Sequence, residues 1–88
     1  MTAKKPPSQP WRLVLTTPSV PVYTKHRSKP AAYRAVEDEK ERVAAGMSRV
    51  VRIAVDQWDV DAQRWVRYED VWDKTSARLA ADRATAEE

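Results

Sequence analysis

The hydrophobic pattern is most regular between residues 49 and 71, where apolar and polar side chains alternate in two successive runs. A two-residue period is typical of β-strands, because successive side chains point to opposite faces of a sheet. This stretch is therefore predicted to form a β-hairpin with one apolar face toward the core. The residues expected on that face are Val51, Ile53, Val55, Val66 and Tyr68.

The alternation also predicts a register for this hairpin. Pairing Val55 with Val66 and Ile53 with Tyr68 joins apolar residues on the core face. A four-residue loop, Asp59 to Ala62, closes that register, although it contains no glycine.

The second face of the predicted hairpin carries charged and aromatic side chains. It pairs Arg52 with Glu69 and places Trp58 and Trp65 together near the turn. Trp58, Trp65 and Trp72 are also spaced by seven residues, a spacing that a continuous helix would align on one side. We favour the hairpin, because β-branched and aromatic residues dominate both runs.

Two different patterns precede the main helix. Residues 11–17 (WRLVLTT) alternate and end at Pro18, which cannot continue a hydrogen-bonded ladder, so they are predicted to form the first strand. Residues 18–29 contain Pro18 and Pro21 and are predicted to form an extended loop. The apolar residues expected to pin this loop to the core are Val20, Val22 and Tyr23.

The main helix is predicted over residues 31–45, with Ser28 as N-cap, Pro30 in the first turn and Gly46 as the stop. Its expected apolar stripe is Ala32, Tyr33, Val36, Val43 and Met47. A second helix is predicted over residues 75–84, with Thr75 or Ser76 as its cap.

These elements predict an α+β domain of order β-α-β-β-α. A small three-stranded antiparallel sheet packs on one main helix, and a short helix follows at the C-terminus. The domain is expected to span residues 11–84, after a flexible, basic, proline-rich tail at 1–10 and before a frayed C-terminus at 85–88.

Composition excludes several kinds of site. The chain of 88 residues has no cysteine, one histidine and one glycine, so it cannot form disulfides, thiolate metal sites or glycine-rich phosphate loops. We therefore expect no enzyme activity, no metal and no cofactor. No apolar run approaches the length of a membrane span, and a cytoplasmic location is expected by default.

Charge is distributed unevenly. Residues 1–36 carry a net +7 and residues 37–88 a net −4. The basic side chains near Tyr23 are suited to phosphate contacts, which makes nucleic-acid binding through the loop at 25–34 the alternative function. The candidate contacts are Lys25, His26, Arg27, Lys29 and Arg34. A solvated loop before a helix, whose charge serves solubility, is the other interpretation.

Aromatic residues supply the main functional hypothesis. Four Trp and three Tyr without any Phe favour partly wet surfaces, because indole and phenol each carry a polar group. The predicted interaction surface is Trp58, Trp65 and Arg67 on the outer hairpin face. Alternatively, Trp72 and Leu79 of the C-terminal segment cover these tryptophans.

The stretch from Trp58 to Glu69, W-D-x-D-A-x-R-W-V-R-Y-E, resembles small uncharacterised accessory proteins of actinobacteria and their phages. This resemblance makes a role in host or phage interactions reasonable. The function expected is a small non-enzymatic protein-interaction module, phage-encoded and acting on a host protein. The partner is expected to be another protein, with nucleic acid as the alternative and no membrane, and the oligomeric state is left open by the exposed sheet edges.

Overall fold

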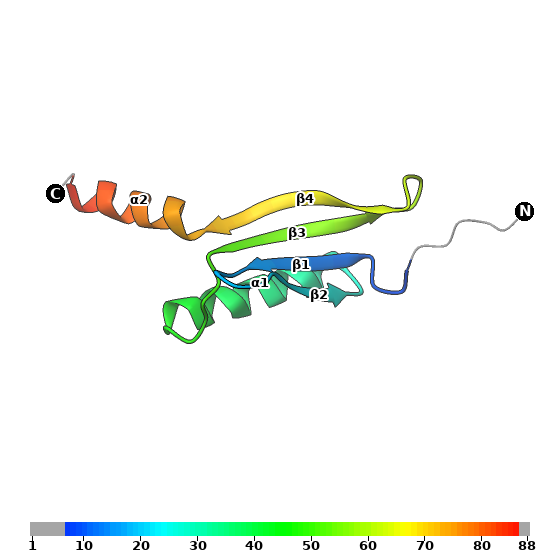
Figure 1. Cartoon of the computed structure of the whole chain (residues 1–88), viewed down its shortest axis with the longest axis horizontal. Coiled ribbons are helices and arrows are strands. Elements are labelled where there is room, and N and C mark those ends of the chain that lie inside the picture. The colour runs from blue at the N-terminus through cyan, green and yellow to red at the C-terminus, as the bar shows by residue number, and fades with distance from the viewer. Residues whose placement is uncertain (1–6, 87–88) are drawn as a thin grey trace, which may run out of the picture.

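The computed structural model describes residues 7–86, with side chains described through residue 80. It is an α+β fold with one four-stranded antiparallel sheet and two helices (Figure 1). The elements in chain order are β1 (Trp11–Thr16), β2 (Val22–His26), α1 (Lys29–Ala44), β3 (Arg52–Asp59), β4 (Arg64–Asp73) and α2 (Lys74–Ala86). The sheet order is β2-β1-β3-β4, so the predicted class is confirmed and the predicted number of strands is wrong by one.

The additional strand is β2, which lies in the segment predicted to be a loop. It pairs with β1 in a regular antiparallel register from Leu15 opposite Val22 to Trp11 opposite His26. Pro18 and Pro21 both precede this strand, so neither interrupts its hydrogen bonds. The two prolines mark the connection between β1 and β2. They do not mean that the whole segment from 18 to 29 is a loop.

The predicted boundaries of the main helix are close to those of α1. The Ser28 side chain accepts a hydrogen bond from the Ala31 backbone, and Pro30 lies in the first turn. At the other end, Gly46 has φ of 75° and donates to the Val43 carbonyl, while Met47 donates to that of Arg42. This pair of bonds is a Schellman ending, whose left-handed residue is most easily glycine.

That ending also corrects the predicted apolar stripe. Ala32 and Val36 are fully buried, and Tyr33 and Val43 pack partly against the same core. Met47, in contrast, follows the end of the helix and is 73% exposed.

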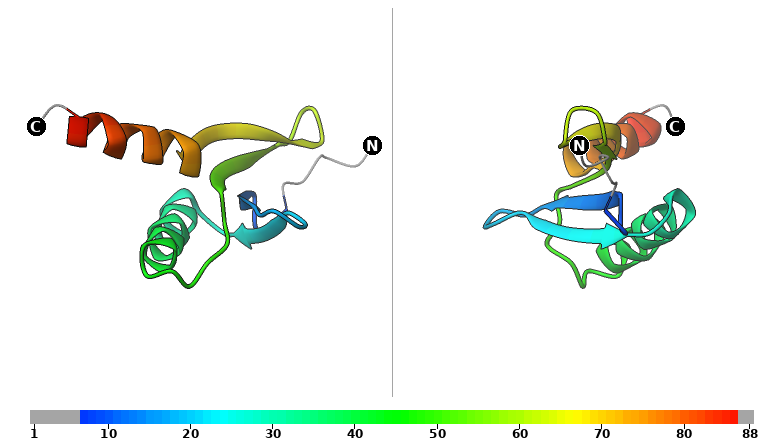
Figure 2. Two further views of the ribbon diagram at one scale, coloured as in Figure 1. Left: turned by 60° about the vertical axis from the view of Figure 1, so that its left-hand side comes forward. Right: turned by 90° about the vertical axis from the view of Figure 1, so that its right-hand side faces the viewer.

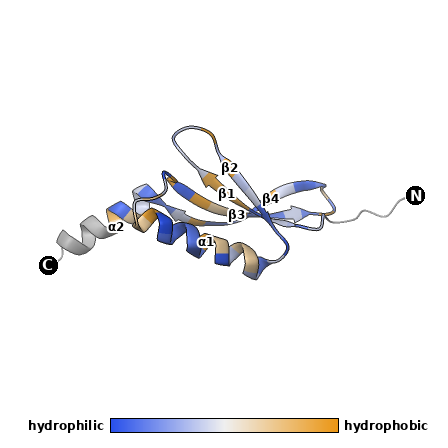
Figure 3. Ribbon diagram, turned by 90° about the horizontal axis from the view of Figure 1, so that it is seen from below, coloured by the Kyte–Doolittle hydropathy of each residue, from blue (hydrophilic) through white to orange (hydrophobic). Residues whose placement is uncertain are grey.

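The core lies between α1 and one face of the sheet (Figure 2). Leu13 and Leu15 of β1 and Ile53 and Val55 of β3 form its sheet side. Hydrophilic residues occur along much of the visible length of α1, in keeping with a helix that buries one side only (Figure 3).

The β3–β4 hairpin forms with a register different from the predicted one. Val55 lies opposite Glu69 instead of Val66, and Ile53 lies opposite Trp72 instead of Tyr68. Arg52, predicted to pair with Glu69, lies opposite Asp73 and forms an ion pair with it (Nε to Oδ2, 3.2 Å).

Two features of the hairpin cause this difference. The turn occupies residues 60–63 instead of 59–62, and it reverses the chain with Gln63 at φ of 54° rather than with a glycine. The pairing then skips Tyr68 and Val71, each of which is an extra residue in β4. Such bulges cannot be read from an alternating pattern, because alternation assumes one partner for each residue.

Each bulge places two successive residues of β4 on the side of α1. The first lets Tyr68 reach Lys29 while Glu69 reaches Tyr33. The second lets Val71 and Trp72 both pack against the core. Val66 and Tyr68, predicted to be core residues, lie on this side but remain exposed.

Helix α2 begins earlier than predicted and leaves the body of the molecule (Figure 1). Its cap is Asp73, whose Oδ1 accepts a hydrogen bond from the Ser76 backbone at 3.0 Å, and not Thr75 or Ser76. Residues 74–80 are all exposed. Residues 1–6 of the tail predicted at 1–10, and residues 87 and 88 of the C-terminus predicted to fray at 85–88, lie outside the described part of the chain. Within the described part of the tail, the Pro10 carbonyl accepts a hydrogen bond from the Trp58 backbone.

Candidate interaction surface on the open face

One face of the sheet has no helix of residues 7–86 over it. Helix α1 covers the opposite face, and α2 extends away from the end of β4 (Figures 1 and 2). Alternation along the four paired strands places a group of aromatic and charged residues on the uncovered face. We call this group the open-face cluster, and its members are Arg12, Tyr23, Asp56, Trp58, Trp65 and Arg67.

Arg12 lies at the centre of the open-face cluster. Its guanidinium carbon is 4.7 Å from the Tyr23 ring centroid and 4.7 Å from the Trp65 ring centroid. A planar guanidinium is attracted to aromatic faces and is less strongly hydrated than an ammonium group. Two rings from strands on either side of β1 therefore hold one cation in place.

Asp56 joins the two arginines of the cluster. One carboxylate oxygen accepts from Arg12 Nε at 2.9 Å, and the other accepts from Arg67 Nε at 2.6 Å. Arg67 also donates through Nη1 to Asp70 at 2.6 Å. The hydrogen bond to Asp56 is the main cause of a raised pKa for Arg67. Since Asp56 is only 4% exposed, this network fixes the arginines against the sheet.

Trp58 and Trp65 share one face, as the alternation predicts, and the observed register also places them directly opposite each other, which the predicted register does not. Their rings pack edge to face with centroids 5.3 Å apart, and both side chains are half-buried. The alternative in which the C-terminal helix covers them is wrong, because α2 starts at the end of β4 remote from the turn. Much of their exposed area therefore remains available on the open face.

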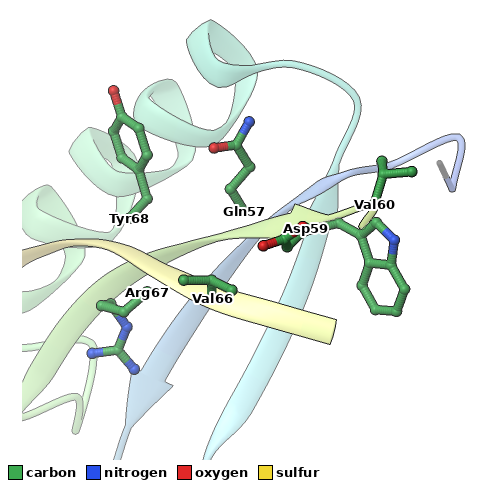
Figure 4. Close-up of a pocket in the computed structure, with 7 residues that line it drawn as sticks. Gln57, Asp59, Val60, Val66, Arg67 and Tyr68 are labelled. Carbon is green, nitrogen blue, oxygen red and sulfur yellow. The ribbon is translucent and has the colours of Figure 1, made fainter. Parts of the chain in front are cut away.

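A hollow of about 320 Å³ lies beside the hairpin turn, but the side chains that line it do not point toward one common centre. Gln57 and Tyr68 project to one side of the two strands, whereas Arg67 projects to the other (Figure 4). Trp58 also lines this hollow, and its indole N–H is buried without a hydrogen-bond partner among the described residues. The hollow is thus lined from both faces of the hairpin, and its shape does not resemble a substrate pocket.

The candidate phosphate contacts are not gathered on one surface. Lys25 is exposed on the open face, opposite Arg12, while His26 points to the other face and hydrogen-bonds Thr24 at 2.9 Å. Burial lowers the pKa of His26 from 6.5, so the imidazole is neutral at pH 7. Arg27 follows the strand and is exposed.

The other two of these basic residues belong to α1. Lys29 donates to the Tyr68 hydroxyl at 2.6 Å, and Arg34 is exposed one turn later. The structure thus places Lys25 on the open face beside the cluster, whereas His26 and Lys29 lie on the side of α1.

A second polar cluster ties α1 to the bulged part of β4. The Lys29 ammonium lies 4.8 Å from the Tyr68 ring centroid, and Trp11 packs edge to face on that ring at 5.0 Å. The Tyr33 hydroxyl donates to Glu69. Burial, followed by this hydrogen bond, raises the pKa of Tyr33, so the phenol remains a donor at neutral pH. These contacts join α1 to β4, the strand at the edge of the sheet.

Sequence reasoning identified Trp58, Trp65 and Arg67 but missed Arg12 and Asp56. It also assigned Tyr23, with Val20 and Val22, to the core, whereas all three are exposed and Tyr23 lies on the open face. Arg12 and Asp56 both lie on the non-core face of strands whose alternation was correctly recognised. The signal that could have found them is the antiparallel pairing of β1 with β3, which places these opposite charges directly across from each other.

Comparison of the chain with protein-family models, with curated proteins and with solved structures found no match. Among residues 7–86, no helix is long and apolar enough to cross a membrane. Within the same part of the chain, no three His, Asp or Glu side chains group in a way that could hold a metal ion.

Proposed function

We propose that this chain is a small non-enzymatic module that binds another protein through the open face of its sheet. The observation that carries the proposal is the Arg12 guanidinium held between Tyr23 and Trp65. Trp, Tyr and Arg are the residues most enriched at the energetic centres of protein interfaces. Their side chains are already positioned here, which reduces the entropy lost on binding.

The charge of the cluster favours a protein partner over a nucleic acid. Asp56 and Asp70 both pair with Arg67, and Asp56 also pairs with Arg12. Binding to a polyphosphate gains most from cations that neutralise phosphates and release counterions. Arginines that carboxylates already neutralise are less suited to binding phosphates. They are better suited to a flat protein surface that has both polar and apolar groups.

The resemblance of residues 58–69 to accessory proteins of actinobacteria and their phages suggests where to seek the partner. An actinobacterial host protein is the first candidate. Its binding surface is expected to be flat and partly apolar, with backbone or side-chain acceptors for the arginine donors that face outward.

The proposal is tested by photo-crosslinking in an actinobacterial lysate. A benzophenone amino acid replaces Tyr23, which is 52% exposed on the open face. The same group at Ala44, exposed at the end of α1, serves as the matched control. A defined protein is expected to crosslink from position 23 and not from position 44.

Competition then assigns the contact to the open-face cluster. Excess unlabelled wild-type protein is expected to abolish the crosslink, as is the Arg34→Ala variant, which alters an exposed residue of α1. Excess Trp65→Ala or Tyr23→Ser is expected to compete at least tenfold less well. Equal competition by all four proteins would contradict the proposal.

A nuclease-treated lysate distinguishes the alternative function. Loss of the crosslink after this treatment, together with binding of a labelled single-stranded oligonucleotide that weakens steeply with salt, would favour nucleic acid instead. A crosslink that survives the treatment is the result expected for a protein partner.

A further inference from the structure

The two edges of the sheet differ in how well they are protected. β4 is interrupted by bulges at Tyr68 and Val71, which disturb the spacing of its backbone groups. Bulges on an edge strand are a common protection against pairing with a further strand. The β4 edge is therefore a poor template for another chain.

In the described part of the chain, no bulge interrupts the β2 edge. All five residues of β2 pair with β1 in an unbroken register, so its outer backbone groups keep regular spacing. Val20, Val22 and Tyr23, at the start of this edge, are 66%, 44% and 52% exposed. The connection between β1 and β2, which carries Val20, projects away from α1 (Figures 2 and 3). An open hydrogen-bonding edge and exposed apolar side chains thus coincide.

We propose that β2 pairs antiparallel with β2 of a second copy of this chain, with Thr24 on the two-fold axis. The interface is the edge of the sheet, so the inference does not depend on the function proposed for the open face. Two antiparallel neighbours related by a two-fold axis keep equivalent faces on the same side of the sheet. Because directly opposite residues share a face, each residue must lie opposite one of the same parity.

Three registers meet this condition and pair most of β2 with its symmetry mate. The side chains and backbone groups that each register places opposite one another favour one of the three. Centring the axis on Lys25 would place two lysines opposite each other, which is destabilising. Centring it on Tyr23 would place Lys25 opposite Pro21, which has no N–H to donate. Centring it on Thr24 places Tyr23 opposite Lys25 of the second copy and pairs all five residues of β2.

The pairing has a further geometric consequence. Both copies of α1 would lie on one side of an eight-stranded sheet, and both open faces would form one surface on the other side. Tyr23 would then contact Arg12 of its own chain and Lys25 of the second copy. In one chain, aromatic rings and cations follow one another in the order Trp65, Arg12, Tyr23. Lys25 of the second copy would extend this series across the two-fold axis.

The absence of cysteine allows a direct crosslinking test. Opposite residues of antiparallel strands have Cα atoms about 4.5–5.5 Å apart, within the range that a disulfide can bridge. Thr24→Cys is therefore expected to form a covalent dimer under mild oxidation, at least tenfold faster than Val66→Cys on the β4 edge. Equal rates for the two variants, or faster dimerisation through position 66, would overturn the inference.

Sedimentation equilibrium over a concentration series provides the second test. The wild-type protein is expected to reach twice the monomer mass, and Tyr23→Lys, which places lysines opposite each other, is expected to weaken dimerisation at least tenfold. Adding Lys25→Glu to that variant places opposite charges across the axis and is expected to restore the dimer. Val66→Lys is the matched control and should have no effect.

Two results would refute the proposed pairing. One is a wild-type protein that stays monomeric up to millimolar concentration. The other is a dimer that the combined Tyr23→Lys and Lys25→Glu substitutions fail to restore while circular dichroism shows the variant to be folded.

Discussion

Among single residues, Asp56 has the largest effect on how the open face is organised. It is almost fully buried, yet its two oxygens accept hydrogen bonds from arginines on two different strands. A buried carboxylate is stable only when its charge is compensated in this way. The position of Arg12 between two rings therefore depends on a residue that a partner would not touch.

Replacing Asp56 with asparagine is expected to lower the free energy of unfolding by about 2 kcal/mol, because charge-assisted hydrogen bonds are lost to arginines that remain partly buried. Chemical denaturation measures this change. Asp38→Asn, on the exposed side of α1, is the control and should change stability by less than about 0.5 kcal/mol. Similar effects for both variants would show that Asp56 does not organise the cluster.

The hairpin turn offers a second prediction for a single residue. Gln63 has φ of 54°, a left-handed conformation that is unfavourable for residues with a Cβ atom. Gln63→Gly is expected to stabilise the protein by about 0.5–1 kcal/mol in thermal or chemical unfolding. Gln63→Ala keeps the Cβ atom and loses the side-chain bond to the Val60 carbonyl, so it should destabilise instead.

Among the elements, α2 differs from the others because its stability has mainly local sources. The described side chains of this helix are exposed, and 13 residues are near the lower limit for a helix that is stable without packing. Its Asp73 cap is consequently important. The hydrogen bond from the Ser76 backbone, followed by that from Arg52, lowers the pKa of Asp73 from 3.8.

This shift predicts how the helix responds to pH. Because the pKa of Asp73 is lower in the folded state, the ionised cap stabilises the protein above about pH 3.8, and this contribution is lost as the pH falls through the folded value. Helical circular dichroism should therefore be constant from pH 5 to about 8 and decrease in acid. Asp73→Asn keeps a capping oxygen without the charge, so its helix content should depend less on pH.

Removal of most of α2 gives a prediction for the element as a whole. Deleting residues 77–88 is expected to reduce the free energy of unfolding of the sheet by less than about 1 kcal/mol, because those described side chains bury little surface. Hydrogen exchange should agree, with faster exchange in α2 than in β1 and β3 of the intact protein. A truncated chain that fails to fold would contradict this expectation.

For the molecule as a whole, sequence patterns predicted which face of the sheet a side chain lies on better than they predicted which residues pair across neighbouring strands. Trp58 and Trp65 share the open face as expected. The turn lies one residue later than predicted, so each β3 residue pairs with a β4 residue two positions further along, and that residue points to the same face of the sheet. The bulges at Tyr68 and Val71 change the pairings further along, and no local pattern indicates them. β2 was missed because its prolines and basic residues resemble a loop, while its pairing with β1 is a contact between segments.

The hydrogen bond from the Lys74 backbone to the Val51 carbonyl has a practical consequence for experiments. It joins the first residue of α2 to the segment that precedes β3, so the helix starts from an anchored point. At 1.5 Å per residue, 13 helical residues span about 20 Å. A fluorophore or surface tether attached at the C-terminus would thus be held at a distance from the sheet, and the chain could be immobilised for binding measurements with its open face accessible.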